Sequence, residues 1–279
     1  KRNGLKNKFP KHSQEWNEEF AKYQERLKND SEFAADAGDL GPVYGSQWLH
    51  WPKFIPVAVE INGKKEDYYV KDPNGINQLE DVIRGMKKDI ASARHMVTAW
   101  NPQEVSDMAL PPCHTLFQFN SDGERLDLML NQRACDMFLG VPFNIASYSM
   151  LTTIFAKELG LELGDFVHTF GDVHFYTGAG ERAKWYQKNL EELKSRVRNV
   201  NGLEEHLETL EWINMSSPPE DKGKEGMDHV TGIIEQLART PKPLPRIKIA
   251  DKHYKDLRIT DFLLEGYNPE AKIERTLAV

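Results

Sequence analysis

The stretch between residues 117 and 159 constrains the fold most. Two apolar, strand-like runs, Phe117 to Phe119 and Leu126 to Leu130, flank the turn-forming sequence Ser-Asp-Gly-Glu. This arrangement predicts a β-hairpin. The following segment, Pro142 to Leu159, is apolar on nearly every side of a helix, which predicts that the helix is buried. A hairpin followed by a buried helix indicates an α+β fold rather than a regular alternation of strands and helices.

Hydrophobic periodicity predicts further elements on both sides of this stretch. Helices are expected over residues 13–35, 76–90, 181–198, 203–213 and 227–238, strands over 95–100, 166–176 and 246–249, and a second hairpin over 57–70 with a Gly-Lys-Lys turn. Residues 1–12 are basic and polar, and we expect them to be frayed. The polar run 216–226 has the composition of a flexible linker.

Composition narrows the class of protein. The net charge of −7 argues against a broad nucleic-acid surface, although it leaves room for a local basic pocket that binds phosphate. Two cysteines in 279 residues do not suggest a disulfide framework and suit a reducing compartment. No apolar run reaches membrane-spanning length, no leader-like start is visible, and the nine histidines lack zinc-site spacing. We expect a cytoplasmic protein that uses no metal, membrane or nucleic acid.

The same central stretch carries reactive groups. Cys113 follows two prolines, which fix φ and donate no backbone hydrogen bond, so the thiol is expected at the end of an extended segment. Arg133 ends the next strand-like run, and Asn144 lies in the first turn of the helix predicted to begin at Pro142. A thiolate is a strong nucleophile and a good leaving group, and a nearby guanidinium stabilises it. From the residues alone, Cys113 as an inert buried thiol and Asn144 as a helix cap remain alternatives.

Several motifs occur in a fixed order along the chain. They are Asp-Leu-Gly-Pro-Val-Tyr-Gly (39–45), Ala-Leu-Pro-Pro-Cys-His (109–114), Gln-Arg-Ala-Cys-Asp (132–136), Gly-Val-Pro-Phe-Asn-Ile-Ala-Ser-Tyr (140–148), Gly-Asp-Val-His-Phe-Tyr (171–176), Glu-Gly-Tyr-Asn-Pro (265–269) and a C-terminal Ala-Val. Together they resemble the folate-dependent thymidylate synthases, over residues 39–50, 77–176 and 227–279. The resemblance implies one α+β domain over 1–279, with a mixed, mostly antiparallel sheet and helices packed on one side. Residues 1–38 would be a variable region and 177–226 an insertion.

The resemblance also implies a reaction. It is the reductive methylation of dUMP to dTMP, with 5,10-methylenetetrahydrofolate as the co-substrate that supplies the carbon and the hydride and leaves as dihydrofolate. Cys113 would add to C6 of the uracil, with Arg133 beside it. Tyr44 would order water for proton removal, and Asn144 would select uracil over cytosine. A buried tyrosine bonded to the backbone is the alternative for Tyr44.

The remaining site residues follow from the same resemblance. His174 and Tyr176, which share one side of a strand, would hold the deoxyribose; Asp136 would bind the folate pterin and take part in substrate binding; Gln132 and His114 would support the site; and Val279 would belong to a tail that closes over the folate. A core histidine–tyrosine pair and a solvated surface aspartate are the alternatives for His174, Tyr176 and Asp136.

The phosphate site departs from the family pattern. Arg133 is kept, but Ala134 stands where the family has a serine. Ala93-Arg94 stands where the family has two arginines that the partner subunit lends, so the resemblance implies a symmetric homodimer that shares Arg94 across its interface. Each charge-assisted hydrogen bond to phosphate contributes roughly 1.5–3 kcal/mol, so we expect weaker phosphate binding.

A further departure concerns the start of the chain. The family has a long upstream segment with a catalytic glutamate, and residues 1–38 resemble instead the tail of an insertion. We therefore expect that this chain is a fragment or lacks those parts, and that it turns over slowly by itself. Two alternatives remain open. Ala93, Asn131 and Ala134 allow a pyrimidine-nucleotide hydroxymethylase of the same fold, and the insertion 177–226 allows a non-catalytic binding or regulatory relative.

Overall fold

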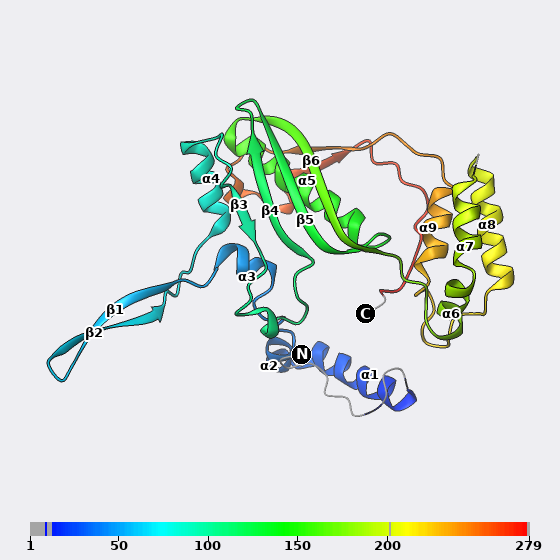
Figure 1. The fold of residues 1–279 in the computed structure, drawn as a ribbon, viewed down its shortest axis with the longest axis horizontal. Helices are drawn as coiled ribbons and strands as arrows, with labels where there is room; N and C mark the ends of the chain where they lie inside the picture. The colour runs from blue at the N-terminus through cyan, green and yellow to red at the C-terminus, as the bar shows by residue number, and fades with distance from the viewer. Residues whose placement is uncertain (1–8, 10–12, 201, 278–279) are drawn as a thin grey trace. The chain divides into compact units, whose positions relative to one another are not determined.

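The structure is a computed structural model that describes residue 9 and residues 13–200 and 202–277 (Figure 1). The predicted fraying of residues 1–12, apart from Phe9, and the predicted role of Val279 therefore lie outside the described residues. The chain divides into two compact units, residues 1–134 with 155–171 and residues 135–154 with 172–279. The prediction of one domain over 1–279 stays a prediction.

A four-stranded sheet forms the centre of the first unit, in the order β3-β4-β5-β6 (Figure 1). Its strands are β3 (Met96–Thr98), β4 (His114–Ser121), β5 (Arg125–Asp136) and β6 (Glu162–His174). The pairs β3–β4 and β4–β5 are antiparallel. Glu162 at the start of β6 bonds to Glu124 just before β5, and Met137 just after β5 bonds to the end of β6, so these two strands run parallel. The predicted mixed sheet and its central hairpin are confirmed.

One face of this sheet carries the core of the first unit. Phe117 lies opposite Leu130 and Phe119 opposite Leu128, and all four side chains are buried. Phe155, in the C-terminal part of α5 (Gly140–Leu159), stacks on Phe119 with a ring separation of 4.8 Å. The opposite face carries exposed apolar side chains, namely Met96, Leu163 and Val167. Helix α5 thus packs on one face of the sheet, as predicted, and the opposite face presents apolar side chains to solvent.

The N-terminal helix is interrupted where periodicity predicted one helix over 13–35. α1 (Gln14–Asn29) and α2 (Ser31–Ala37) are separated by Asp30, whose backbone is extended. The Asp30 carboxylate accepts the Phe33 N–H at 2.9 Å, a local bond that competes with a continuous helix. α3 (Tyr44–Leu49) and α4 (Gln78–Lys88) follow, and α4 lies within the range predicted for it.

The second hairpin pairs β1 (Phe54–Ile61) with β2 (Lys64–Lys71). Its turn is Asn62-Gly63, one residue earlier than the predicted Gly-Lys-Lys turn. Both turn residues have positive φ, 52° and 74°, which a tight two-residue hairpin turn requires and which asparagine and glycine tolerate best.

The second unit contains a group of helices. They are α6 (Gly180–Lys188), α7 (Leu190–Arg198), α8 (Leu203–Ser216) and α9 (His229–Leu237), and α7, α8 and α9 lie side by side in Figure 1. Buried Tyr186, Leu193, Ile213, Val230 and Ile234 form their shared core.

The single helix predicted over 181–198 is divided at Asn189. The predicted strand 246–249 is confirmed as β7 (Arg246–Ile249), and it pairs with β8 (Phe262–Glu265), which the sequence did not predict. Short 3-10 turns cover Val105–Asp107, Tyr254–Asp256 and Ile259–Asp261.

The prediction that α5 is buried throughout is wrong for its first turns. The helix begins at Gly140, and Phe143 is 73% exposed, whereas Tyr148 and Phe155 further along are buried. The exposed apolar turn lines a cavity, described below, so its hydrophobic residues do not belong to the core.

The polar run 216–226 is not the free linker that its composition suggested. The Glu220 carboxylate accepts the backbone N–H groups of Gly226 and Asp228, both at 2.8 Å. Thr177 and Asp228 form an antiparallel bridge, so the insertion leaves and rejoins the rest of the unit at neighbouring positions. A long insertion that closes in this way adds little loop-closure cost.

Candidate active site

Cys113 is positioned by a tyrosine from a distant part of the chain. Tyr44, the first residue of α3, accepts the N–H of Cys113 at 2.7 Å and that of His114 at 3.3 Å through its hydroxyl oxygen. Its ring lies 5.2 Å from the His114 ring. Burial raises the pKa of Tyr44, so the hydroxyl keeps its proton at neutral pH. Tyr44 is thus bonded to the backbone, as in the simpler alternative, but to the backbone of the thiol segment itself.

Arg133 is attached to the same segment from the other side. Its backbone N–H donates to the Cys113 carbonyl at 2.8 Å. Its guanidinium donates through Nε to the Pro112 carbonyl at 2.8 Å and through an Nη to the Pro111 carbonyl at 3.0 Å. Prolines lack an N–H but keep their acceptor. The two prolines before the thiol therefore hold the predicted cation next to the half-buried Cys113.

Gln132 is held by a histidine that the sequence analysis missed. Gln132 is buried, and its Oε1 lies 2.8 Å from Nε2 of His168 on β6. Its own Nε2 donates to the Ala134 carbonyl at 2.9 Å. Burial, with a smaller effect of the nearby His114, lowers the pKa of His168. Alternation along β6, where Phe166, His168 and Phe170 share one side, was the available signal.

A glycine allows β6 to approach the Arg133 backbone. A Cβ placed on Gly171 would lie 2.6 Å from the Arg133 carbonyl oxygen, closer than any side-chain carbon is found. The glycine of the Gly-Asp-Val-His-Phe-Tyr motif is therefore explained by packing against the strand that carries Arg133.

The second unit brings another set of predicted residues together. Asp136 turns its carboxylate toward the backbone that follows it, and accepts the N–H groups of Phe138 and Leu139 at 3.2 and 3.3 Å. His174, the last residue of β6, lies edge-on to Tyr176 with 5.3 Å between the rings. The predicted pairing of these two residues is observed, although Tyr176 lies beyond the end of the strand.

Gly140 lies beside both Asp136 and Asn144. A Cβ on Gly140 would come within 3.3 Å of the Asp136 Cβ and 3.8 Å of the Asn144 Oδ1. Since α5 begins at Gly140, Asn144 lies past its first turn rather than at a capping position. The alternative of a helix cap is therefore wrong.

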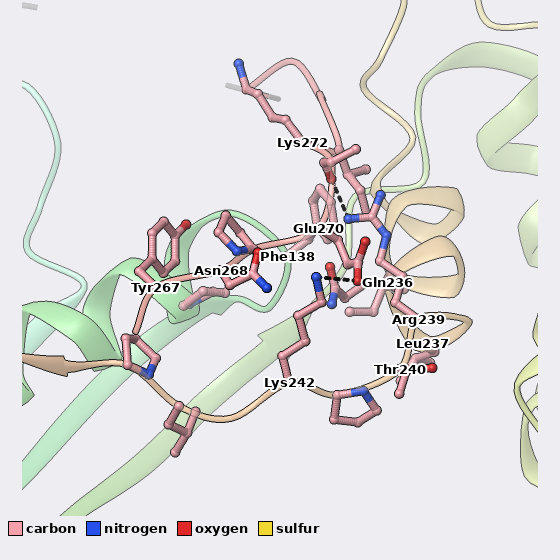
Figure 2. Close-up of a pocket in the computed structure, with 18 of the residues that line it drawn as sticks. Phe138, Gln236, Leu237, Arg239, Thr240, Lys242, Tyr267, Asn268, Glu270 and Lys272 are labelled. Carbon is pink, nitrogen blue, oxygen red and sulfur yellow. Dashed lines mark hydrogen bonds and ion pairs between the residues drawn. The ribbon is translucent and has the colours of Figure 1, made fainter. Parts of the chain in front are cut away.

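A cavity of about 900 Å³ lies in the second unit beside these residues (Figure 2). Its walls are residues 137–139 with Pro142 and Phe143, the end of α9 with the proline-rich run 239–245, and the segment 267–273. An ion pair between Lys242 and Glu270, 2.7 Å long, links two of these walls. Tyr267 and Asn268, from a motif that received no role in the sequence analysis, also line the cavity.

Arg94 is exposed and lies in the turn between α4 and β3. It lies two residues before Met96, whose side chain is on the open face of the sheet. Within residues 9, 13–200 and 202–277, no cluster of histidine, cysteine, aspartate or glutamate is arranged to bind a metal ion. Over the same residues, no helix has the length and apolar character needed to cross a membrane.

Comparison with known proteins identifies the family of this chain. The sequence profile of the family described as thymidylate synthase matches residues 6–279. A thymidylate synthase of Haloferax volcanii is 37% identical over 249 residues, which are 88% of this chain and 72% of that protein. One from Mesoplasma florum is 37% identical over 273 residues, 97% of this chain and 70% of that protein. One from Listeria monocytogenes is 34% identical over 263 residues, and the chain spans only 62% of its length.

Proposed function

The chain belongs to the thymidylate synthase family, and on that basis we propose that it methylates dUMP to dTMP with 5,10-methylenetetrahydrofolate as co-substrate. The observation that carries the proposal is the arrangement around Cys113, whose backbone is bonded to both Tyr44 and Arg133. A hydroxymethylase is not favoured, since the relatives described above all carry the name thymidylate synthase.

In the proposed reaction the Cys113 thiolate forms a bond to C6 of the uracil ring. The electron pair moves to C5, which forms a bond to the methylene carbon of the folate as the bond from that carbon to N10 breaks. C5 then loses its proton as the bond from the same carbon to N5 breaks, which leaves an exocyclic methylene group. The folate transfers a hydride to this exocyclic carbon, and the C6–sulfur bond breaks as the C5–C6 double bond returns. The products are dTMP, dihydrofolate and a regenerated thiolate, so atoms and electrons balance.

The other predicted residues would bind and orient the substrates. Arg133 stabilises the thiolate and contributes to binding the phosphate, because its guanidinium is held beside the thiol segment. Tyr44, protonated at neutral pH, orders water for proton removal. Asn144 recognises the uracil edge and Asp136 the pterin, which the shared turn at Gly140 supports. His174 and Tyr176 hold the deoxyribose, and Gln132 and His114 support the site.

We further propose a symmetric homodimer in which Arg94 contributes to the partner's phosphate site. The open apolar face with Met96, Leu163 and Val167 supports this assembly, since exposed apolar faces mark contact surfaces. Arg94 lies at the edge of β3, the strand that carries Met96. A cytoplasmic location is part of the proposal and is supported by the two free cysteines.

The test is the intact mass of the chain after incubation with 5-fluoro-dUMP and 5,10-methylenetetrahydrofolate. Fluorine at C5 cannot leave as a proton does, so a competent site should remain as a covalent adduct carrying both ligands. We expect the adduct in the unmodified chain and in Cys135→Ser, whose thiol is buried, and no adduct in Cys113→Ser. An unmodified chain that gains no mass would overturn the proposed activity for this chain.

A further inference from the structure

His229 occupies a central position in the second unit that no part of the reaction above uses. It is the first residue of α9 and is 0% exposed. Its backbone N–H donates to the Tyr176 carbonyl at 2.9 Å. Its ring lies 5.2 Å from the Tyr176 ring and 5.5 Å from the Phe138 ring. An imidazole packed in this way is held in one orientation.

One ring nitrogen of His229 binds the C-terminal segment. Nε2 lies 2.9 Å from the Thr276 carbonyl oxygen, and because a carbonyl only accepts, Nε2 carries the proton. Thr276 is tied at two further points, since its N–H donates to the Gly226 carbonyl and its hydroxyl to the Glu225 carbonyl, both at 2.8 Å. The last described residues of the chain are thus anchored on α9 and on the end of the insertion.

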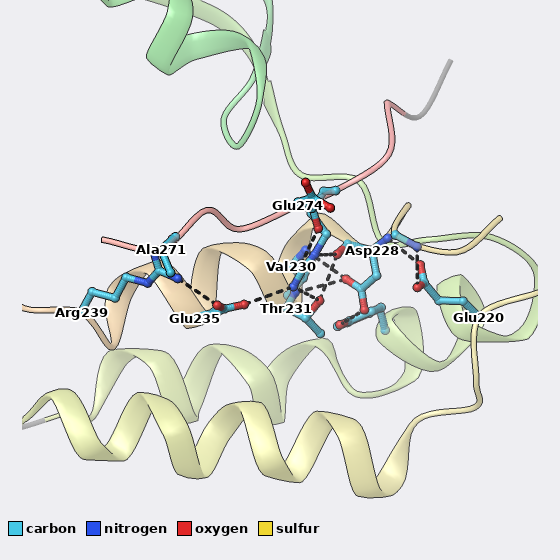
Figure 3. Close-up of polar contacts among 11 residues, drawn as sticks. Glu220, Asp228, Val230, Thr231, Glu235, Arg239, Ala271 and Glu274 are labelled. Carbon is cyan, nitrogen blue, oxygen red and sulfur yellow. Dashed lines mark hydrogen bonds and ion pairs between the residues drawn. The ribbon is translucent and has the colours of Figure 1, made fainter. Parts of the chain in front are cut away.

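The neighbouring Arg275 strengthens this anchor. Its Nε donates to the Asp228 carbonyl at 3.1 Å and an Nη donates to the Thr231 hydroxyl at 3.2 Å. Figure 3 shows these contacts gathered around the start of α9, together with the ion pair from Glu235. The position of the C-terminal segment is therefore fixed by the same turn that places His229.

The other ring nitrogen faces the carboxylate assigned to the pterin. Nδ1 of His229 lies 3.7 Å from an Asp136 oxygen, and it has no hydrogen-bond partner among the described residues. A buried polar atom without a partner is costly and usually has a reason. Nδ1 packs near Asp136 without a hydrogen bond while Nε2 bonds to Thr276, so the ring lies between the carboxylate and the C-terminal segment.

We propose that His229 is a positioning residue that couples the C-terminal segment to Asp136 and thereby sets the affinity for the folate. The proposal rests on the proposed function, since it assumes that Asp136 binds the pterin. With Nε2 bonded to Thr276, the ring is held so that Nδ1 faces Asp136. Loss of the Thr276 contact removes the hydrogen bond that helps to fix the ring beside Asp136, and so changes the packing around the carboxylate. His229 acts through Asp136 and not on the thiol, so its effect falls on folate binding.

The same contacts give the end of the insertion 177–226 a role in holding the C-terminal segment. Glu225 and Gly226 belong to it, and they hold the threonine that His229 holds. Gly226 has φ 78°, and a Cβ there would lie 3.0 Å from the Thr276 hydroxyl oxygen. The end of the insertion is therefore shaped to receive the C-terminal segment.

Two substitutions of His229 distinguish the contributions of its two ring nitrogens. In His229→Gln the amide reaches the place of Nε2 and keeps a donor for Thr276, whereas in His229→Asn the amide reaches only the place of Nδ1. We expect both to raise the KM for 5,10-methylenetetrahydrofolate about tenfold, which corresponds to 1.4 kcal/mol, with the KM for dUMP unchanged. Either substitution combined with Asp136→Asn should be no worse than Asp136→Asn alone, because residues that act through one another are not additive.

Hydrogen exchange at the Thr276 amide tests the coupling without activity. We expect exchange to remain slow in His229→Gln and to become about tenfold faster in His229→Asn. Because coupling is reciprocal, Asp136→Asn should also speed exchange at Thr276 in the free protein. Additive effects, an equal rise in both KM values, or a Thr276 amide indifferent to Asp136→Asn would each overturn the proposal. The unmodified chain could form no fluoro-dUMP adduct while the substitutions still change exchange at the Thr276 amide as expected. That result would support the coupling through His229 and overturn only the proposed activity.

Discussion

The hydroxyl oxygen of Tyr44 accepts the backbone N–H of Cys113 across 2.7 Å, although 69 positions separate the two residues in the chain. This bond ties the short helix α3 to the residue that precedes β4. Arg133 bonds to the same segment through the Cys113 carbonyl. The backbone of Cys113 is thus fixed on both its N–H and its C=O side, which limits how far the thiol can move.

Tyr44→Phe should leave the N–H of Cys113 without its acceptor. A half-buried N–H that loses its partner destabilises a protein by about 1–3 kcal/mol, and the thiol should also be less well placed. We expect a lower free energy of unfolding in urea and a slower fluoro-dUMP adduct. Tyr69→Phe is the matched control, since Tyr69 is 70% exposed on β2, and it should change stability by less than about 0.5 kcal/mol. Equal effects of the two substitutions would contradict the role given to the hydroxyl.

Gly171→Ala should force β6 away from β5 at Arg133. The added carbon would lie 2.6 Å from the Arg133 carbonyl oxygen, and overpacking of this kind costs about 1–3 kcal/mol. We expect a lower unfolding midpoint and less adduct on Cys113, because Arg133 moves with its backbone. Gly45→Ala is the control, since a Cβ there meets nothing within 4 Å and lies in helix α3, where alanine is favoured. A Gly171→Ala chain as stable as the Gly45→Ala chain would contradict this account.

Asp228→Ala should be the most destabilising of these changes. The Asp228 side chain is 2% exposed, lies 2.6 Å from Arg182 Nε and accepts the Tyr186 hydroxyl at 2.7 Å. It also caps α9 through the N–H of Val230. Breaking a buried ion pair from one side costs about 3–5 kcal/mol because the other charge is left buried.

The measurement for Asp228→Ala is urea denaturation, with Glu181→Ala as its control. Glu181 also pairs with a cation, Lys184, but both side chains are largely exposed. Exposed pairs contribute about 0–1 kcal/mol, so this control should unfold almost as the unmodified chain does. Comparable losses from the two substitutions would mean that the buried network around Asp228 is weaker than its geometry indicates.

Local pattern was enough to predict the central sheet. The apolar runs around Phe117 and Leu130 flank a turn-forming sequence, and this arrangement predicted that they pair as a hairpin. The groups around the thiol were also predictable as a set, because their motifs resemble one family. What the sequence did not predict was how they are held. The Tyr44 bond to Cys113 and the Pro111 and Pro112 bonds to Arg133 join distant segments, and no local pattern encodes them.

The errors have local physical causes. Periodicity continued through Asp30 because its neighbours are spaced as in one helix, but its carboxylate bonds to the Phe33 N–H and ends the helix. Composition made 216–226 resemble a linker, although Glu220 ties it back to Gly226. His229 was missed because its neighbours in space come from segments far apart in sequence.

Stability should fall in mildly acidic solution because of His168. Burial lowers the pKa of its imidazole, and His114 lowers it further. An unfolded histidine binds a proton as the pH falls below about 6.5, whereas native His168 still resists protonation there. The unfolded state therefore binds more protons, and the free energy of unfolding decreases as the pH falls through this range. Urea denaturation between about pH 5 and 8 measures this slope.

The contribution of His168 is isolated by His168→Gln, because a glutamine amide can still donate to the Gln132 oxygen that Nε2 contacts at 2.8 Å but does not titrate. The substitution should reduce the pH dependence while leaving the Gln132 contact in place. An NMR titration of the His168 ring gives the direct comparison, with an expected midpoint below the ordinary value of about 6.5. A midpoint at or above that value, or an unchanged slope in His168→Gln, would show that burial on β6 does not disfavour the charged ring.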